Sequence, residues 1–379
     1  MRFGDVTGHE DVKQSLREMV DSDRIPHALL LSGPQGLGKM LLTRALLQYI
    51  YCSDRRDGEP CGRCPACLQT AALNNPDIHW VFPVVKIKGK PTVSTDFYTE
   101  WKIMLEKHPY MEPEKWLDII EAGNTRPVIY LDEANDIIRN APLSSLSYRY
   151  KTYVIWLPEA MNLQAANTLL KLIEEPYPDT LFILVSDHPE DVLPTILSRT
   201  RRLNMRPVPP AAIEEWLRTR AGLTPSEAAS SAAMAAGSPG KAIEFASNTG
   251  EQEEFGDIYR QMMRHAWKRE VASLKELSEE IASMGREKNM RFLDYCSRMT
   301  RENFLCNFTL PPLNALSDEE LRFSTHFAPF INYRNVENLI TQTDRARRDI
   351  SRNANAKIVM FDFMLSLCAI IRVQSGIKT

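Results

Sequence analysis

Two groups of residues in this chain of 379 have the types and spacing that chemistry requires, and the first is a glycine-rich loop. Its glycines and its lysine follow the pattern G-x-x-x-x-G-K at Gly33, Gly36, Gly38 and Lys39. An apolar run at residues 28–31 precedes the loop, and a helix-like run at 41–51 follows it. This context turns backbone N–H groups and the positive end of a helix toward a polyphosphate, which the lysine also reaches. The sequence therefore predicts a nucleotide-phosphate site for ATP or ADP.

The position after the lysine departs from this pattern, because it holds Met40 instead of serine or threonine. In P-loop enzymes the hydroxyl at this position binds the Mg²⁺ that bridges the phosphates. The loop is thus built for a nucleotide but lacks one group needed to use it. Whether ATP or ADP still binds is left open by the sequence.

The second group is a cysteine cluster with the spacing C-x(8)-C-x(2)-C-x(2)-C, formed by Cys52, Cys61, Cys64 and Cys67. Four thiolates complete a tetrahedral shell around Zn²⁺ and leave no open position, so we expect a structural metal rather than a catalytic one. Three arginines, Arg55, Arg56 and Arg63, are placed to offset the negative charge of such a site. The alternative is four unliganded thiols.

Length and composition describe an ordinary globular protein of two or three domains. A net charge of −3 excludes a strongly basic nucleic-acid coat. No apolar run approaches the roughly 18 residues of a membrane span, and the N-terminus lacks the apolar core of a signal peptide. We therefore expect a cytoplasmic protein with no membrane partner. In that reducing compartment the three cysteines outside the cluster are expected to pack in a core, at Cys296, Cys306 and Cys368.

Two segments compete for the role of the acidic strand that organises Mg²⁺ and water in such a site. The first, residues 128–134, is an apolar run that ends in Asp132 and Glu133. The second, residues 153–160, holds Pro158 where the aspartate belongs and Glu159 after it. On the local pattern alone, the first segment is the better match.

The order of the elements that follow favours the second segment. A helix whose apolar residues recur on one face ends in Glu-Glu-Pro at residue 176, an apolar strand follows at 180–185, and then comes the pair Ser198 and Arg199. This order resembles the clamp-loader ATPases, a branch of the AAA+ family, and the resemblance covers about residues 1–245. By this resemblance Asp132 and Glu133 open a helix over 134–139, where carboxylates favour the N-terminal turn.

The resemblance implies an α/β AAA+ core with a parallel five-stranded sheet at residues 1–206. This core carries the zinc module at 52–67 and an insertion at 86–125. A small helical lid is expected at 207–247, followed by an all-α collar, the oligomerisation domain, at 248–379. The collar helices are expected over residues 255–284, 288–307, 332–353 and 358–373. A self-contained bundle is the alternative to a collar.

Several departures from active family members concern phosphoryl transfer, which depends on metal and charge stabilisation. Met40 removes a Mg²⁺ ligand, Pro158 removes the carboxylate that anchors the metal's water, and Glu159 then has no organised water to polarise. In the lid, Gly240 stands where active relatives carry arginine, and Lys241 comes one residue late. By the resemblance, this chain is not expected to hydrolyse ATP at a useful rate.

Arg199 is retained, and in this family it is the arginine finger that enters a neighbour's ATP site. Within the family the combination is most similar to the delta-prime branch of bacterial DNA polymerase III. This branch implies a stator in a hetero-pentamer with gamma/tau and delta subunits, which loads the sliding clamp at primer-template DNA. The rival is an active gamma/tau-type motor, which needs Asp132 and Glu133 in the acidic strand. A P-loop nucleoside kinase would leave the Ser-Arg pair unexplained.

Other polar residues are expected to have structural roles. His79 lies in an apolar strand and is predicted to pack or cap rather than bind metal. The lysines of a predicted hairpin, Lys86, Lys88 and Lys90, are expected to be solvated rather than bound to nucleic acid. Helix residues 345–352 carry four arginines, at Arg345, Arg347, Arg348 and Arg352, which form either a solvated face or a DNA contact.

Overall fold

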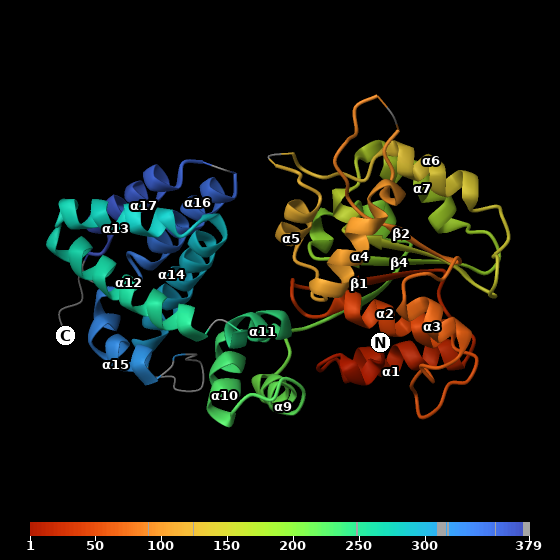
Figure 1. The fold of residues 1–379 in the computed structure, drawn as a ribbon, viewed down its shortest axis with the longest axis horizontal. Coiled ribbons are helices and arrows are strands. Elements are labelled where there is room, and N and C mark those ends of the chain that lie inside the picture. The colour runs from red at the N-terminus through yellow and green to blue at the C-terminus, as the bar shows by residue number, and fades with distance from the viewer. Residues whose placement is uncertain are drawn as a thin grey trace. The chain divides into compact units, whose positions relative to one another are not determined.

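The computed structural model describes residues 1–89, 91–123, 125–247, 249–308, 316, 318–352 and 354–373 (Figure 1). The chain forms two compact units: residues 1–221 with 237–241, and residues 222–236 with 242–379. Lys90, one of the predicted hairpin lysines, lies outside the described residues. Among the described residues, no helix has both the length and the apolar character needed to cross a membrane.

A five-stranded parallel sheet forms the centre of the first unit, in the order β2-β3-β4-β1-β5. Its strands are β1 (Ala28–Ser32), β2 (Ile78–Val81), β3 (Lys151–Trp156), β4 (Thr180–Ser186) and β5 (Arg201–Asn204). Every residue of β1, β3 and β4 is buried, as expected for strands covered on both faces. The prediction of a parallel five-stranded α/β core is thereby confirmed.

Helices cover both faces of this sheet. Leu29 and Leu31 point to the face covered by α1 (Glu10–Asp21) and α2 (Lys39–Tyr51), while Ala28 and Leu30 point to the face covered by α6 (Leu131–Asn140) and α7 (Leu163–Glu174) (Figure 1). The unit also contains α3 (Pro65–Ala71), α4 (Tyr98–Lys107), α5 (Pro113–Ile119), α8 (Pro194–Leu197) and α9 (Pro210–Arg220). Because the strands are parallel, the segments that follow β1, β3 and β4 all lie at the carboxyl-terminal end of the sheet.

Residues 86–125 are packed into the first unit through an aromatic cluster. Trp101 of α4 stacks on Phe82 with ring centroids 4.2 Å apart, and Trp116 of α5 makes an edge contact with Phe82 at 5.1 Å. Both tryptophans also contact Trp156 at the end of β3. The Trp116 indole N–H donates to the Pro83 carbonyl at 2.7 Å. These contacts fix α4 and α5 near the edge of the sheet that follows β3.

The two candidate acidic strands differ clearly in structure. Residues 151–156 form β3, whereas Val128 and Ile129 make only isolated bridges, and α6 begins at Leu131. Asp132 and Glu133 therefore lie in the first turn of α6, as predicted, although this helix is longer than the expected 134–139. His79 of β2 stacks on Tyr153 at 4.8 Å, which agrees with the predicted packing role.

Glu133 provides a pH-dependent test of this packing. Burial raises the pKa of its carboxyl group from 4.5 to about 7, against the hydrogen bond that it accepts from the Ser94 N–H. The folded state therefore binds more protons than the unfolded state between pH 4.5 and about 7, so raising the pH through this window destabilises the fold. We expect Glu133→Gln to leave stability unchanged below this window and to increase it above the window by on the order of 1–3 kcal/mol.

Urea unfolding of the two proteins across this pH range checks this prediction. Asp132→Asn, one position away in the same turn and partly exposed, is the matched control. A stability difference between Glu133→Gln and the parent that does not change with pH would contradict the burial argument.

The second unit is helical throughout the part that the structure describes. It contains α10 (Pro225–Met234), α12 (Thr249–Lys268), α13 (Val271–Ser283), α14 (Arg286–Cys306), α15 (Asp318–Phe327), α16 (Val336–Ser351) and α17 (Ala356–Ile370). The helix α11 (Pro239–Ser247) begins in the short segment assigned to the first unit. Cys296 and Cys368 are buried in this unit's core, as predicted, while Cys306 is half-buried.

The helix boundaries of this unit correct the sequence prediction in two places. The prediction of a single helix over 255–284 is wrong. The helix is interrupted between α12 and α13, where Arg269 adopts a left-handed φ of 59°. Neither glycine nor proline marks this break, and the apolar spacing continues across it. The short helix α15 was not predicted at all, while Asn353, the expected end of the third helix, lies outside the described residues.

Candidate functional site

The glycine-rich loop connects β1 to α2 and has the shape that its sequence predicts. Gly36 and Gly38 have φ values of 81° and 85°, in the left-handed region that favours glycine, and Gly38 caps α2. The Lys39 ammonium curls back over the loop and donates to the carbonyls of Gly33 and Pro34, each at 2.6 Å. Met40 is only 2% exposed and belongs to the apolar core beneath the loop.

A carboxylate that the sequence analysis did not single out completes this loop. Asp187 directly follows β4, and its Oδ1 lies 2.8 Å from Lys39 Nζ. Both side chains are almost fully buried, at 4% and 8% exposure. One sequence signal could have identified Asp187: it is an acidic residue directly after the apolar run that forms β4. The carboxyl end of β4 lies beside that of β1.

Pro158 and Glu159 lie at the same edge, in a short 3₁₀ helix (Pro158–Ala160) directly after β3. Glu159 Oε1 accepts hydrogen bonds from the backbone N–H groups of Asp187, at 2.9 Å, and His188, at 3.0 Å. Burial raises the pKa of the Glu159 carboxyl, and these hydrogen bonds oppose that effect. Glu159, the carboxylate that remains of the expected acidic pair, is therefore hydrogen-bonded to the backbone that follows β4.

Gly240 is held directly against the phosphate loop. Its N–H donates to the Gly36 carbonyl at 3.0 Å. A Cβ atom at position 240 would lie 3.0 Å from Tyr110 Cβ and Cγ and 3.2 Å from Gly36 Cα. A side chain at this position would therefore require its neighbours to shift by a few tenths of an ångström. The neighbouring Lys241 is exposed.

Arg199 lies between α8 and the edge strand β5, and its side chain is 31% exposed. Its Nε lies 2.8 Å from Glu174 Oε2, and its Nη1 donates to the Thr195 carbonyl at 2.9 Å. The adjacent Arg201 and Arg202 are also exposed. The guanidinium is thus held in place near the edge of the sheet while part of it stays accessible.

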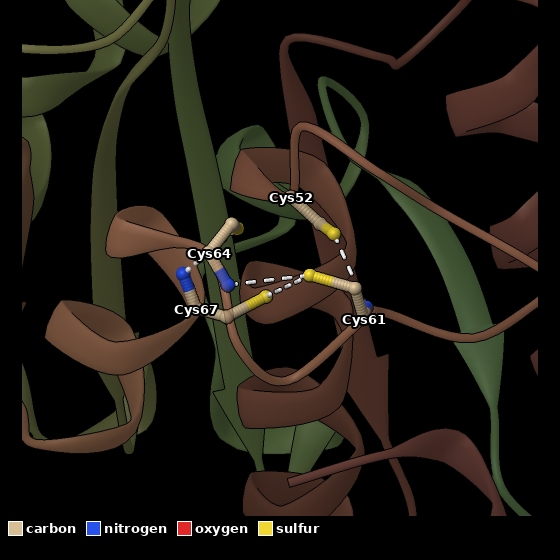
Figure 2. A group of neighbouring side chains, drawn as sticks. All are labelled: Cys52, Cys61, Cys64 and Cys67. Atoms are coloured by element: carbon tan, nitrogen blue, oxygen red, sulfur yellow. Dashed lines mark hydrogen bonds between the residues drawn. The ribbon is translucent and has the colours of Figure 1, made fainter.

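The four clustered cysteines converge on one point (Figure 2). Cys52 caps the end of α2, Cys64 caps the start of α3, and Cys61 and Cys67 complete the group. All four Sγ atoms lie within 4.8 Å of one another, with Cys61 and Cys67 at 4.0 Å. A tetrahedral Zn²⁺ with bonds of about 2.3 Å places its sulfur ligands about 3.8 Å apart. The cluster therefore fits a structural zinc ion, which these four residues would hold.

The surroundings of the sulfurs favour the thiolate at Cys61 and Cys64, whereas burial raises the pKa of the Cys52 and Cys67 thiols. Backbone N–H groups of Asp54 and Cys61 donate to Cys52 Sγ at 3.4 and 3.2 Å, and Cys61 Sγ accepts from the Cys64 N–H at 3.4 Å. Burial alone would raise the pKa of Cys64, but hydrogen bonds from Ser53 and Cys67 lower it to about 6. Two of the arginines that were expected to offset the charge of the site, Arg56 and Arg63, form ion pairs with Asp54.

The cysteine module also holds the start of the chain. Both Glu59 carboxylate oxygens accept backbone N–H groups, from Phe3 at 2.8 Å and from Gly4 at 2.9 Å. Phe3 is fully buried and makes an edge contact with Tyr49 of α2. The loop that carries the clustered cysteines is therefore linked to the N-terminal segment that packs beside the P-loop helix.

A P-loop on β1 of a five-stranded parallel sheet, with the cysteine module after α2, defines a protein of the clamp-loader AAA+ class. Residues 8–209, more than half of the chain, match the family model described as "DNA polymerase III, delta subunit". The chain belongs to this family, and it is close to the delta-prime subunits of bacterial DNA polymerase III.

Individual relatives include both delta-prime and gamma/tau subunits. The delta-prime subunit of Haemophilus influenzae is 30% identical over 242 residues, which cover 64% of this chain and 60% of that protein. The gamma/tau subunit of Mycobacterium tuberculosis is 28% identical over 215 residues, covering 57% of this chain and 30% of that protein. The chain thus spans less than two thirds of the length of these relatives.

Among solved structures, a gamma subunit-related DNA polymerase III protein from Thermotoga maritima aligns with a TM-score of 0.43 and 14% identity. That alignment covers 95% of this chain and 99% of the other. The Holliday-junction branch-migration motor RuvB of the same organism aligns with a TM-score of 0.37 and 16% identity, over 64% of this chain and 61% of RuvB.

Proposed function

We propose that this chain is a delta-prime-type subunit of a DNA polymerase III clamp loader that does not hydrolyse ATP itself. In this proposal it acts as a stator in a hetero-pentamer with gamma/tau and delta subunits, and it supports the loading of the sliding clamp at primer-template DNA. The single observation that carries the proposal is the state of the P-loop: the side chain after Lys39 is a core methionine, and Lys39 itself is paired with Asp187.

Each departure removes a different part of the phosphoryl-transfer machinery. Met40 offers no hydroxyl to Mg²⁺, and Pro158 offers no carboxylate to the metal's water shell. Gly240 offers no cation, and a longer side chain there would press on Gly36 and Tyr110. Catalysis of phosphoryl transfer depends on these charges, so their combined loss supports an inactive site in cis.

Arg199 supports a role in trans. Its guanidinium is partly exposed and is held by Glu174 and the Thr195 carbonyl, which limits the conformations that it must lose on docking. In the proposed complex it completes the ATP site of a neighbouring gamma/tau subunit. The zinc ion is structural in this proposal and has no part in the reaction.

The helical unit is proposed to be the collar through which the subunits assemble. The helix α17 exposes Ile358 and Leu365, at 69% and 37%, on one face, which supports contact with another subunit. The basic residues near the end of α16 support a structural role rather than DNA binding. Arg345 lies 3.9 Å from both Asp349 and Asp362, and Arg347 lies 2.8 Å from Asp294.

Steady-state ATP hydrolysis by the purified chain with Mg²⁺ tests the proposal. We expect turnover at background level, equal to that of Lys39→Ala, because the lysine has no metal-bound phosphate to stabilise. The competing function is a gamma/tau-type motor, and the similarity to gamma/tau subunits supports this alternative. Robust turnover that Lys39→Ala abolishes would establish the motor and overturn the stator.

A further inference from the structure

The turn between α4 and α5 lies directly over the phosphate loop. It closes with a hydrogen bond from the Met111 N–H to the His108 carbonyl at 2.8 Å, and Met111 has a left-handed φ of 57°. A bulky residue in this region costs free energy that packing must offset. Met111 is 3% exposed, and Tyr110 packs against the same core, so both side chains point inward.

The contacts of Tyr110 place it against both walls of the nucleotide site. A Cβ atom on Gly38 would lie 3.5 Å from Tyr110 Cε1, and a Cβ atom on Gly240 would lie 3.0 Å from Tyr110 Cβ and Cγ. Burial raises the pKa of the Tyr110 phenol to about 12, as expected for a ring enclosed by protein. The tyrosine therefore fills the space between the P-loop and the Gly240 turn.

The cavity that is left at the P-loop is very small. It has a volume of about 10 Å³, and its lining residues include Gly36, Gly38, Lys39 and Asp187 together with Tyr110 and Met111. That volume holds roughly one water molecule. Sites for ligands the size of a nucleotide are usually about 300–1,000 Å³. Nucleotide binding therefore requires Tyr110 and Met111 to leave.

The donors of Lys39 are satisfied within the protein, whereas Asp187 Oδ2 and Glu159 Oε2 are buried without a hydrogen-bond partner among the described residues. An ammonium group has three N–H donors. Lys39 Nζ has three acceptors within reach: the carbonyls of Gly33 and Pro34 at 2.6 Å, and Asp187 Oδ1 at 2.8 Å. A phosphate would have to displace the Asp187 carboxylate, which is an anion buried at the same place.

We propose that the P-loop of this chain is a self-filled site, in which Tyr110 and Met111 occupy the space and Asp187 takes the place of the anion that a nucleotide would supply. Trp101 and Trp116 are almost fully buried and anchor α4 and α5. They thereby hold Tyr110 and Met111, which lie between these two helices, in place. This inference concerns nucleotide binding by the isolated chain. It holds whether or not Arg199 acts on a neighbouring subunit.

Fluorescence anisotropy with a fluorescent ADP tests the inference on the full chain. We expect the parent protein to show no saturable binding up to about 1 mM, which corresponds to a binding free energy weaker than about −4.1 kcal/mol. The variant Tyr110→Ala/Met111→Ala/Asp187→Asn, which empties the cavity and frees the lysine, is expected to bind at least about 100-fold more tightly, or by about 2.7 kcal/mol. Adding Lys39→Ala to that variant should abolish the binding.

Two single variants serve as matched controls. Tyr110→Phe keeps the ring and should still exclude ADP, and Lys107→Ala changes an exposed residue of the same segment and should behave like the parent. Circular dichroism and zinc content report whether each variant folds. Lys39-dependent binding of ADP by the parent, or no binding by a folded triple variant, would overturn the proposal.

Hydrogen exchange on the parent provides a second test that needs no folded variant. Excess ADP is expected to leave the exchange rates of the amides at 33–39 and 108–111 unchanged, because the site is already closed by the protein. Protection of these amides by ADP would overturn the proposal on its own.

Discussion

Replacing Arg199 by alanine is expected to lower ATP turnover by about 10³-fold or more at the neighbouring site that, under the proposed function, this chain completes in a reconstituted clamp loader. Trans-acting arginines in GTPases contribute ~10³–10⁵ in rate because they stabilise charge that develops only in the transition state. The substitution should not unfold the chain, because the Arg199–Glu174 pair is half-exposed and such pairs contribute only about 0–1 kcal/mol.

Single-turnover hydrolysis by complexes that contain this chain measures the effect at the relevant site. Arg218→Ala is the matched control, since Arg218 is also an exposed arginine with a single ion pair, to Glu215. Arg199→Lys should recover little activity, because an ammonium lacks the planar fork of the guanidinium. Assembly followed by size-exclusion chromatography should be unchanged. Normal turnover by an assembled Arg199→Ala complex would rule out the trans-acting role.

Cys64→Ser is expected to release the zinc ion that we propose the four cysteines hold, and to destabilise the first unit. A structural zinc site contributes directly to folding, and losing a ligand should weaken metal binding by more than the roughly 10–100-fold that loss of an outer-shell partner costs. The loss should extend to the chain start, because Glu59 in the same loop holds the backbone of Phe3 and Gly4. We therefore expect faster hydrogen exchange at residues 3–6 as well as a lower melting temperature.

Elemental analysis and thermal melting of the purified proteins measure both effects. Cys306→Ser, which changes a half-buried thiol outside the cluster, is the matched control and should keep its zinc. Chelation of zinc from the parent should reproduce the exchange pattern of Cys64→Ser. Retention of one zinc ion per chain by Cys64→Ser would mean that the four cysteines are not the complete ligand set.

The features of this protein that depend on local spacing could be predicted from its sequence. Neighbouring residues alone determine several of these features. They are the apolar runs of β1, β3 and β4, the P-loop, the cysteine cluster, and the position of Asp132 and Glu133 at the start of a helix. Even the choice between two acidic strands was possible, because the order of elements after residue 160 constrained it.

The contacts that close the nucleotide site could not be predicted in this way. Lys39 meets Asp187 only because β1 and β4 are neighbours in the sheet, and Tyr110 reaches Gly240 only because the tryptophans of α4 and α5 pack against Phe82. Neither Asp187 nor Tyr110 belongs to a motif. The break at Arg269 was missed for a related reason: the apolar faces of α12 and α13 both point into one core, so their spacing reads as one helix.

Under the proposed function, the close fit of Gly240 against Tyr110 and Gly36 would oppose a return of catalysis. A side chain at 240 would press on Tyr110 and Gly36, and a hydroxyl at 40 would lie beside a cavity of only about 10 Å³. Under the same proposal, each single reversion would restore only one of the missing parts of the ATP site. The proposed division of labour between stator and motor subunits would then depend on several positions of this chain rather than on one.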